Sequence, residues 1–276
     1  MSETSVALMG AIAGFTIFLG LPVARMRGLG SRGQGFLNAI AAGVLIFLLV
    51  EILAHANESV EDAVLDLGKG ETGNAALLAG VYIAGLTAGL LGLVWFNRIF
   101  RRRSARMGGL RGPGAAVAAE AMAAPGARHL ALMIATGLGL HNFSEGLAIG
   151  QSAASGALAL TGVLVVGFGL HNITEGFGIA APLASDGDRP SWALLGTAGL
   201  IGGGPTFLGA VIGFNVVADW AFVLFLALAA GALLYVINEM FGVCRRLNSP
   251  PALAAGLLVG FLAAFGTELV LALAGG

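Results

Sequence analysis

The stretch LALMIATGLGLHNFSEGLAIGQSAASGALALTGVLVVGFGLHNITEGFGIA, residues 130–180, contains one hexapeptide pattern twice, as HNFSEG at 141–146 and HNITEG at 171–176. Each copy places a His four residues before a Glu, in surroundings that are mostly apolar residues and glycine. Apolar runs of this length suit helices that cross a bilayer, where ionisable side chains are costly. The repeated His and Glu pair therefore needs a functional explanation.

The rest of the chain has the same apolar character. Of its 276 residues, 57% are apolar and only 11% are charged, whereas soluble domains carry about 25% charged residues. Eight segments approach the ~20 apolar residues that a spanning helix needs: residues 5–24, 34–56, 75–97, 129–150, 158–182, 191–214, 219–242 and 252–274. The sequence therefore predicts an all-α polytopic membrane protein with eight transmembrane helices. We expect the chain to form a single transmembrane domain over residues 1–276, with a cytoplasmic loop at about 98–128.

Net charge and cysteine content exclude several other classes of protein and of metal site. The formal net charge of -1 gives no basis for nucleic-acid binding. The single cysteine, Cys244, excludes a disulfide framework and a thiolate metal cage. The first ten residues, MSETSVALMG, lack the basic leader of a cleavable signal, so we expect residues 5–24 to act as the first span.

Arginines predict the orientation of the spans. They follow spans one, three and seven, which places all of them on one side: Arg25, Arg27, Arg32, Arg98, Arg101, Arg102, Arg103, Arg106, Arg111, Arg245 and Arg246. The positive-inside rule makes that side cytoplasmic and puts both termini outside the plasma or inner membrane of the cell. The opposite side carries an acidic loop, interpreted either as a solvated loop or as a collector of cations. Its acidic residues are Glu58, Glu61, Asp62, Asp66 and Glu71.

The two motifs predict a central metal site. Positions i and i+4 share one face of a helix, so His141 points with Glu145, and His171 with Glu175. The short turn QSAASGA makes spans four and five antiparallel neighbours, which brings the first His level with the second Glu and the first Glu level with the second His. Two imidazoles and two carboxylates suit Zn²⁺, Fe²⁺, Mn²⁺ or Cd²⁺. The alternative is two buried ion pairs that hold the helices together.

Each motif also carries an asparagine. Asn142 and Asn172 are metal-site candidates of lower rank, because an amide can complete the coordination or orient the ligands from outside. Plain hydrogen bonding between helices is the alternative.

A second repeat relates more distant spans. AAGVLIFLLVE at 41–51 is similar to AAGALLYVINE at 229–239, and FLG occurs both at 18–20 and at 207–209. The paired spans run in opposite directions, so the sequence predicts an inverted repeat of spans 1–3 and 6–8 around spans 4–5.

The inverted repeat places two carboxylates on opposite sides of the central site. Glu51 lies near the outer end of span two, with His55 one turn further out, and Glu239 lies near the inner end of span seven. All three are lower-ranked candidate ligands for an ion on its way to or from the centre; the alternative is that the carboxylates merely reach an interface. Glu268 and His129 are interpreted as interfacial residues.

The paired HN-x-x-EG motifs resemble the Zrt/Irt-like (ZIP) family of divalent metal transporters, in its prokaryotic branch. Eight spans, outward termini, a long loop after span three and FLGLPVAR at 18–25 are similar to the family's pattern. The resemblance implies transport of a divalent transition metal toward the cytoplasm by alternating access, Zn²⁺ first and Fe²⁺, Mn²⁺ or Cd²⁺ as alternatives. Spans one, four, five and six would move against two, three, seven and eight. The metal is cargo, so neither a cofactor nor an enzyme activity is expected.

This chain departs from the family pattern at a few positions. Ser144 and Thr174 stand where proline usually precedes the Glu, and they can bend a helix by bonding to the i−4 carbonyl. Relatives with a two-metal centre have acidic residues where this chain has Asn172 and Thr206, so we expect a mononuclear site. The long loop also lacks the His-rich tract of some relatives.

Other functions stay open at this level. An intramembrane metal-dependent hydrolase could use the same ligands with an activated water, although no separate general base accompanies the motifs. A haem-binding electron carrier could use His141 and His171 as axial ligands, which leaves the glutamates unexplained. A cation-diffusion exporter would have fewer spans and a soluble C-terminal domain. The expected partners are divalent metal ions and the lipid bilayer, without nucleic acid, and a homodimer is left open.

Overall fold

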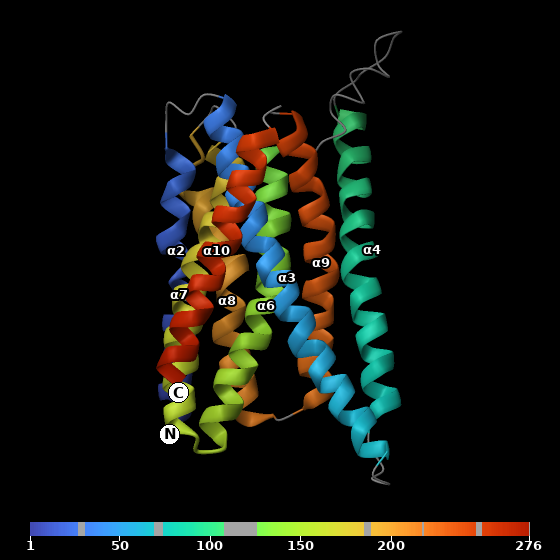
Figure 1. Ribbon diagram of the computed structural model, residues 1–276, viewed down its shortest axis with the longest axis vertical. Helices are drawn as coiled ribbons and strands as arrows, with labels where there is room; N and C mark the ends of the chain where they lie inside the picture. The colour runs from blue at the N-terminus through green and yellow to red at the C-terminus, as the bar shows by residue number, and fades with distance from the viewer. Residues whose placement is uncertain are drawn as a thin grey trace.

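The computed structural model describes residues 1–26, 31–68, 74–107, 126–184, 189–216, 218–246 and 250–275. Within these ranges the regular elements are helices, which form one elongated bundle with both termini at the same end (Figure 1). They are α1 (Glu3–Phe15), α2 (Ile17–Gly20), η1 (Leu21–Arg25), α3 (Ser31–Gly68), α4 (Ala75–Met107), α6 (Ala127–Ala154), α7 (Leu158–Ala184), α8 (Trp192–Asn215), α9 (Asp219–Arg246) and α10 (Pro250–Gly275).

The structure confirms an all-α polytopic membrane protein. Seven helical segments of the described residues are long and apolar enough to cross a bilayer, the first of them being α1, α2 and η1 in succession. The predicted fourth span is present as α6, but it does not meet the same measure of apolarity. Polar side chains explain this, because His129, His141, Asn142 and Glu145 all lie on α6 and are buried against other helices.

The predicted acidic loop is wrong over most of its length. Helix α3 continues to Gly68, so the acidic residues from Glu58 to Asp66 lie on a helix. The reason is local: residues 52–67 contain neither glycine nor proline and are rich in Ala, Leu and Glu, which favour helix. Glu71 lies outside the described residues, as do residues 108–125 of the predicted cytoplasmic connection, while helix α4 extends to Met107.

Glycine contacts reproduce the inverted repeat in the outer helices. A Cβ on Gly43 of α3 would lie 2.2 Å from the carbonyl oxygen of Leu257 on α10, and one on Gly231 of α9 would lie 2.2 Å from that of Leu86 on α4. Gly43 and Gly231 occupy the same place in the two similar segments, AAGVLIFLLVE and AAGALLYVINE. Such small residues let helix backbones approach closely inside a membrane.

The reciprocal contacts match as well. A Cβ on Gly260 of α10 would lie 2.0 Å from the carbonyl oxygen of Ile40, and one on Gly89 of α4 would lie 2.1 Å from that of Leu228. Ile40 and Leu228 directly precede the two similar segments. The α3–α10 pair therefore has the same packing, residue by residue, as the α9–α4 pair.

The central helices show a second set of paired contacts. A Cβ on Gly20 would lie 2.2 Å from the carbonyl oxygen of Ile173 on α7, and one on Gly209 of α8 would lie 2.2 Å from that of Phe143 on α6. Gly20 and Gly209 end the two FLG segments, and the partners occupy the same position in the two HN-x-x-EG motifs. The repeat thus extends to the helices that carry the motifs.

These close approaches divide the helices into two groups. Helices α1, α2, α6, α7 and α8, with η1, form the motif group; helices α3, α4, α9 and α10 form the flanking group. Among the described glycines, every added Cβ that would come within 3.0 Å of another helix meets a helix of its own group. Gly137 and Gly178 face the other group, and there the nearest atoms are 3.5 and 3.9 Å away, an ordinary van der Waals contact.

Candidate metal centre

The two motif helices form an antiparallel hairpin. Helix α6 ends at Ala154 and α7 begins at Leu158, as the short polar turn predicts. Gly156 in this turn has φ 78°, a left-handed conformation that glycine adopts without strain. The tight reversal places the two motifs at the same depth of the bundle.

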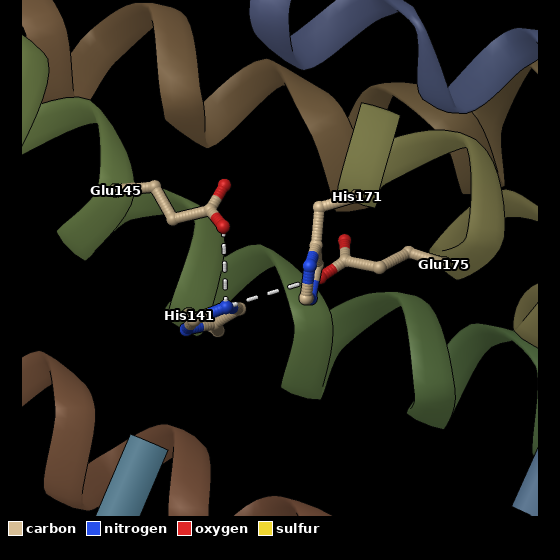
Figure 2. Close-up of side chains that lie close together, drawn as sticks. All are labelled: His141, Glu145, His171 and Glu175. Atoms are coloured by element: carbon tan, nitrogen blue, oxygen red, sulfur yellow. Dashed lines mark ion pairs between the residues drawn. The ribbon is translucent and has the colours of Figure 1, made fainter. Parts of the chain in front are cut away.

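The four predicted ligands converge (Figure 2). One ligand atom from each of His141, Glu145, His171 and Glu175 lies within 4.8 Å of those of the other three. The Nε2 atom of His141 is 3.3 Å from a carboxylate oxygen of Glu145 and 4.0 Å from one of Glu175. The second distance confirms that the first His lies level with the second Glu.

The centre is buried and its polar atoms are incompletely paired. His141, Glu145, His171 and Glu175 are all at most 5% exposed. Both ring nitrogens of His141, Nε2 of His171 and one carboxylate oxygen of each Glu have no hydrogen-bond partner. Buried polar atoms are nearly always paired, because leaving one unpaired costs about 1–3 kcal/mol. Nitrogen and oxygen atoms in this arrangement offer the mixed ligand set that a divalent transition metal accepts.

The two asparagines tie the centre to the rest of the motif group. Asn142 donates its side-chain amide to the Asn172 side chain (2.7 Å), to Glu175 (2.7 Å) and to the Gly202 carbonyl of α8 (3.1 Å). Asn172 donates to the Ala13 carbonyl of α1 at 3.0 Å. These bonds favour an orienting role, although the carbonyl oxygen of Asn142 is buried without a partner.

Ser144 and Thr174, which directly precede the glutamates of the two motifs, bond to the backbone. The hydroxyls of Ser144 and Thr174 donate to the carbonyls of His141 and His171, each at 2.6 Å. Both are i−3 bonds rather than the expected i−4 bonds. They leave the two motif helices continuous, so each His and its Glu share one helical face.

The lower-ranked candidates are spread over three places. Glu51 approaches one residue of the centre, with a carboxylate oxygen 3.9 Å from Nε2 of His171. His55 is exposed and bonds through Nδ1 to the backbone carbonyl of Glu51 at 3.0 Å. Neither His55 nor Glu239 belongs to a possible ligand group among the described residues.

Two residues that sequence reasoning placed at an interface have other surroundings. His129 is buried, accepts or donates a hydrogen bond with Asn97 (3.1 Å) and stacks on Phe96. Glu268 of α10 forms a possible ligand group with Glu51 and His171. The sequence feature that could have identified Glu268 as functional is its position inside an apolar span, because ionisable residues at that depth are usually functional.

Comparison with known proteins supports the interpretation of this centre as a metal site. The family model described as ZIP zinc transporter matches residues 115–240, which include both motifs and helices α6, α7 and α8. No curated protein matches the chain. The family's members are transporters of divalent metal rather than enzymes. The paired motifs and the buried His and Glu centre lie within the matched residues of this polytopic helical bundle, and they support its membership of the ZIP zinc transporter family.

Proposed function

We propose that the protein carries Zn²⁺ toward the cytoplasm by alternating access, with His141, Glu145, His171 and Glu175 as the ligands in transit. The observation that carries this proposal is the convergence of four buried ligand atoms within 4.8 Å of one another. Two imidazole and two carboxylate ligands suit Zn²⁺ in tetrahedral geometry, and they also accept Fe²⁺, Mn²⁺ or Cd²⁺.

A mononuclear centre fits the charge of the site. Two carboxylates can neutralise one divalent ion, and the positions that could anchor a second ion are neutral. Asn172 donates its side-chain amide to the Ala13 carbonyl. Thr206 on α8 is buried, and its hydroxyl has no hydrogen-bond partner. We therefore expect purified protein to hold close to one tightly bound ion per chain.

The division into two helix groups supports alternating access. All four ligands and both asparagines belong to the motif group, whose helices are held together by close backbone contacts. The contacts between the groups lack these close approaches at Gly137 and Gly178. A motif group that slides as one body would carry the ion past Glu51 and Glu239 of the flanking group.

Metal binding should weaken as pH falls. Imidazole and carboxylate must be deprotonated to ligate a metal, so protons compete with the ion at all four side chains. We expect the Kd for Zn²⁺ to rise steadily between neutral and mildly acidic pH, as measured by equilibrium titration against a calibrated chelator. A Kd that stays constant over this range would mean that the histidines are not ligands.

The orientation can be tested with single cysteines. The native Cys244 is buried, and burial raises the pKa of its thiol to about 11, so it should react slowly with maleimides at neutral pH. Ser155→Cys, in the exposed turn after α6, should be labelled by an impermeant maleimide from outside intact cells. Met26→Cys, at the exposed end of η1, should be labelled only after permeabilisation. The reverse pattern would contradict outward termini.

Transport itself separates this proposal from its rivals. Purified protein reconstituted in sealed vesicles should take up ⁶⁵Zn²⁺ down a gradient, and Glu145→Gln should abolish the uptake. A haem carrier would show Soret absorbance in the purified protein, and a hydrolase would leave vesicle zinc unchanged. Vesicles that accumulate neither zinc nor any of the alternative ions would contradict the proposal.

A further inference from the structure

We propose that Glu51, Glu268 and His171 form a second divalent-cation site on the outer side of the central one, at the interface between the two helix groups. Glu51 lies on α3 and Glu268 on α10, both in the flanking group, whereas His171 lies on α7 in the motif group. The site therefore exists only in the arrangement of the two groups in which His171 faces these carboxylates.

The geometry suits three ligands around one ion. One ligand atom from each of the three residues lies within 4.8 Å of the other two. Glu51 Oε2 and His171 Nε2 are 3.9 Å apart, and the Glu268 carboxyl group completes the cluster. Ligands bound about 2.1 Å from a tetrahedral ion lie roughly 3.4 Å apart, so a small closure of the three side chains would complete the site.

Unpaired atoms point to a cation as the missing partner. His171 is 4% exposed, and its Nε2 atom and Glu51 Oε2 are both buried without a hydrogen-bond partner. The carboxyl groups of Glu51 and Glu268, with ligand atoms within 4.8 Å of each other, also repel each other when both are ionised. A divalent cation bound among the three side chains would pair both orphan atoms and remove this repulsion.

The inverted repeat shows that this arrangement is confined to one side. Gly89 and Gly260 are equivalent in the repeat, and the same alignment places Asn97 of α4 opposite Glu268 of α10. Asn97 is a neutral amide that already bonds to Tyr235 and to His129. The inner half of the repeat therefore has a carboxylate at Glu239, the equivalent of Glu51. At the equivalent of Glu268 it has Asn97, whose amide already has hydrogen-bond partners.

His171 links the new site to the centre. A neutral imidazole has one unprotonated nitrogen, so His171 can ligate one ion at a time, either with Glu51 and Glu268 or with the central ligands. An ion arriving from outside would bind first at the outer cluster and then exchange across His171 into the centre. This role in transport rests on the proposed function, whereas the existence of the site does not.

Equilibrium binding tests the site without transport. The double variant His141→Ala with Glu175→Ala removes half of the central ligands and keeps all three outer ones. Isothermal titration with Zn²⁺ should show one residual site of weaker affinity. Adding Glu268→Gln should weaken it at least about tenfold, since a ligand contributes no less than an outer-shell partner does. Adding Glu3→Gln, an exposed carboxylate on α1, should leave it unchanged.

The outcomes distinguish this inference from the proposed function. If Glu268→Gln leaves the residual Zn²⁺ binding intact, or if the double variant has none, the outer site is overturned while the central one stands. If wild-type protein holds no tight ion, the proposed function fails whatever the residual site does. Glu268→Asp, which keeps the charge, should restore binding in part and so distinguish loss of a ligand from misfolding.

Uptake kinetics supply a second readout. In otherwise wild-type protein, Glu268→Gln should leave the tightly bound central ion in place but raise the KM for uptake about tenfold, with kcat little changed, because capture rather than central binding is impaired. An unchanged KM would contradict a role in capture.

Discussion

Replacing His141 and Glu175 together by alanine is expected to abolish tight zinc binding. The two side chains approach to 4.0 Å from different helices, so the double change removes one ligand from each side of the centre. Loss of a mere outer-shell partner costs about 10–100-fold in metal affinity, and loss of two direct ligands from a buried site should exceed 100-fold. Elemental analysis after dialysis should show the bound zinc fall from near one ion per chain to the level of the weak outer site.

Thr136→Ala is the matched control for this experiment. Thr136 lies on the same helix as His141, is exposed, and bonds only to the Leu132 carbonyl of its own helix. It should retain the wild-type zinc content. Size-exclusion profiles of the metal-free proteins should be alike, because the double change removes buried ionisable groups and leaves the glycine contacts intact. Wild-type affinity in the double variant would rule out the central site.

Gly89→Ala is expected to lower the stability of the protein, whereas Gly92→Ala should leave it unchanged or raise it. The two glycines lie three residues apart on α4. A Cβ at Gly89 would lie 2.1 Å from the Leu228 carbonyl oxygen of α9, whereas a Cβ at Gly92 would meet no atom within 4 Å. Overpacking of this kind costs about 1–3 kcal/mol. In open space, alanine in a helix stabilises by roughly 0.5–1 kcal/mol relative to glycine.

Thermal unfolding in detergent, followed by tryptophan fluorescence, should therefore give a lower Tm for Gly89→Ala and an equal or higher Tm for Gly92→Ala. The inverted repeat adds an internal check. Gly260→Ala, the equivalent change on α10, should resemble Gly89→Ala, since its Cβ would lie 2.0 Å from the Ile40 carbonyl oxygen. Equal Tm values for Gly89→Ala and Gly92→Ala would mean that the α4–α9 contact is not the close one described.

Local patterns in the sequence were sufficient to predict the helices and the convergence of His141, Glu145, His171 and Glu175. Apolar length determines where a bilayer-spanning helix forms. The i, i+4 spacing puts His141 beside Glu145, and His171 beside Glu175. The short turn around Gly156 permits only an antiparallel pair. Because every step depends on neighbours within about thirty residues, the meeting of four ligands followed without knowledge of the other helices.

The similar segments at 41–51 and 229–239 likewise predicted a relation between distant spans. The prediction failed where a boundary depended on the surroundings. The charged residues at the end of α3 suggest a solvent-exposed loop, yet solvent-facing residues extend a helix equally well when their helix propensity allows it.

Only the tertiary structure decided which faces meet. Periodicity says which residues share a face of one helix, but the helix that covers this face is chosen by the packing of the whole bundle. Glycines Gly89 and Gly92 look alike in the sequence and differ entirely in their contacts. Glu268 looked like an interfacial carboxylate, and only the packing of α10 against α3 and α7 brings it to Glu51 and His171. Contacts between residues this far apart in the chain carry no local signature, so the outer cation site belongs to the fold and not to any single segment of the sequence.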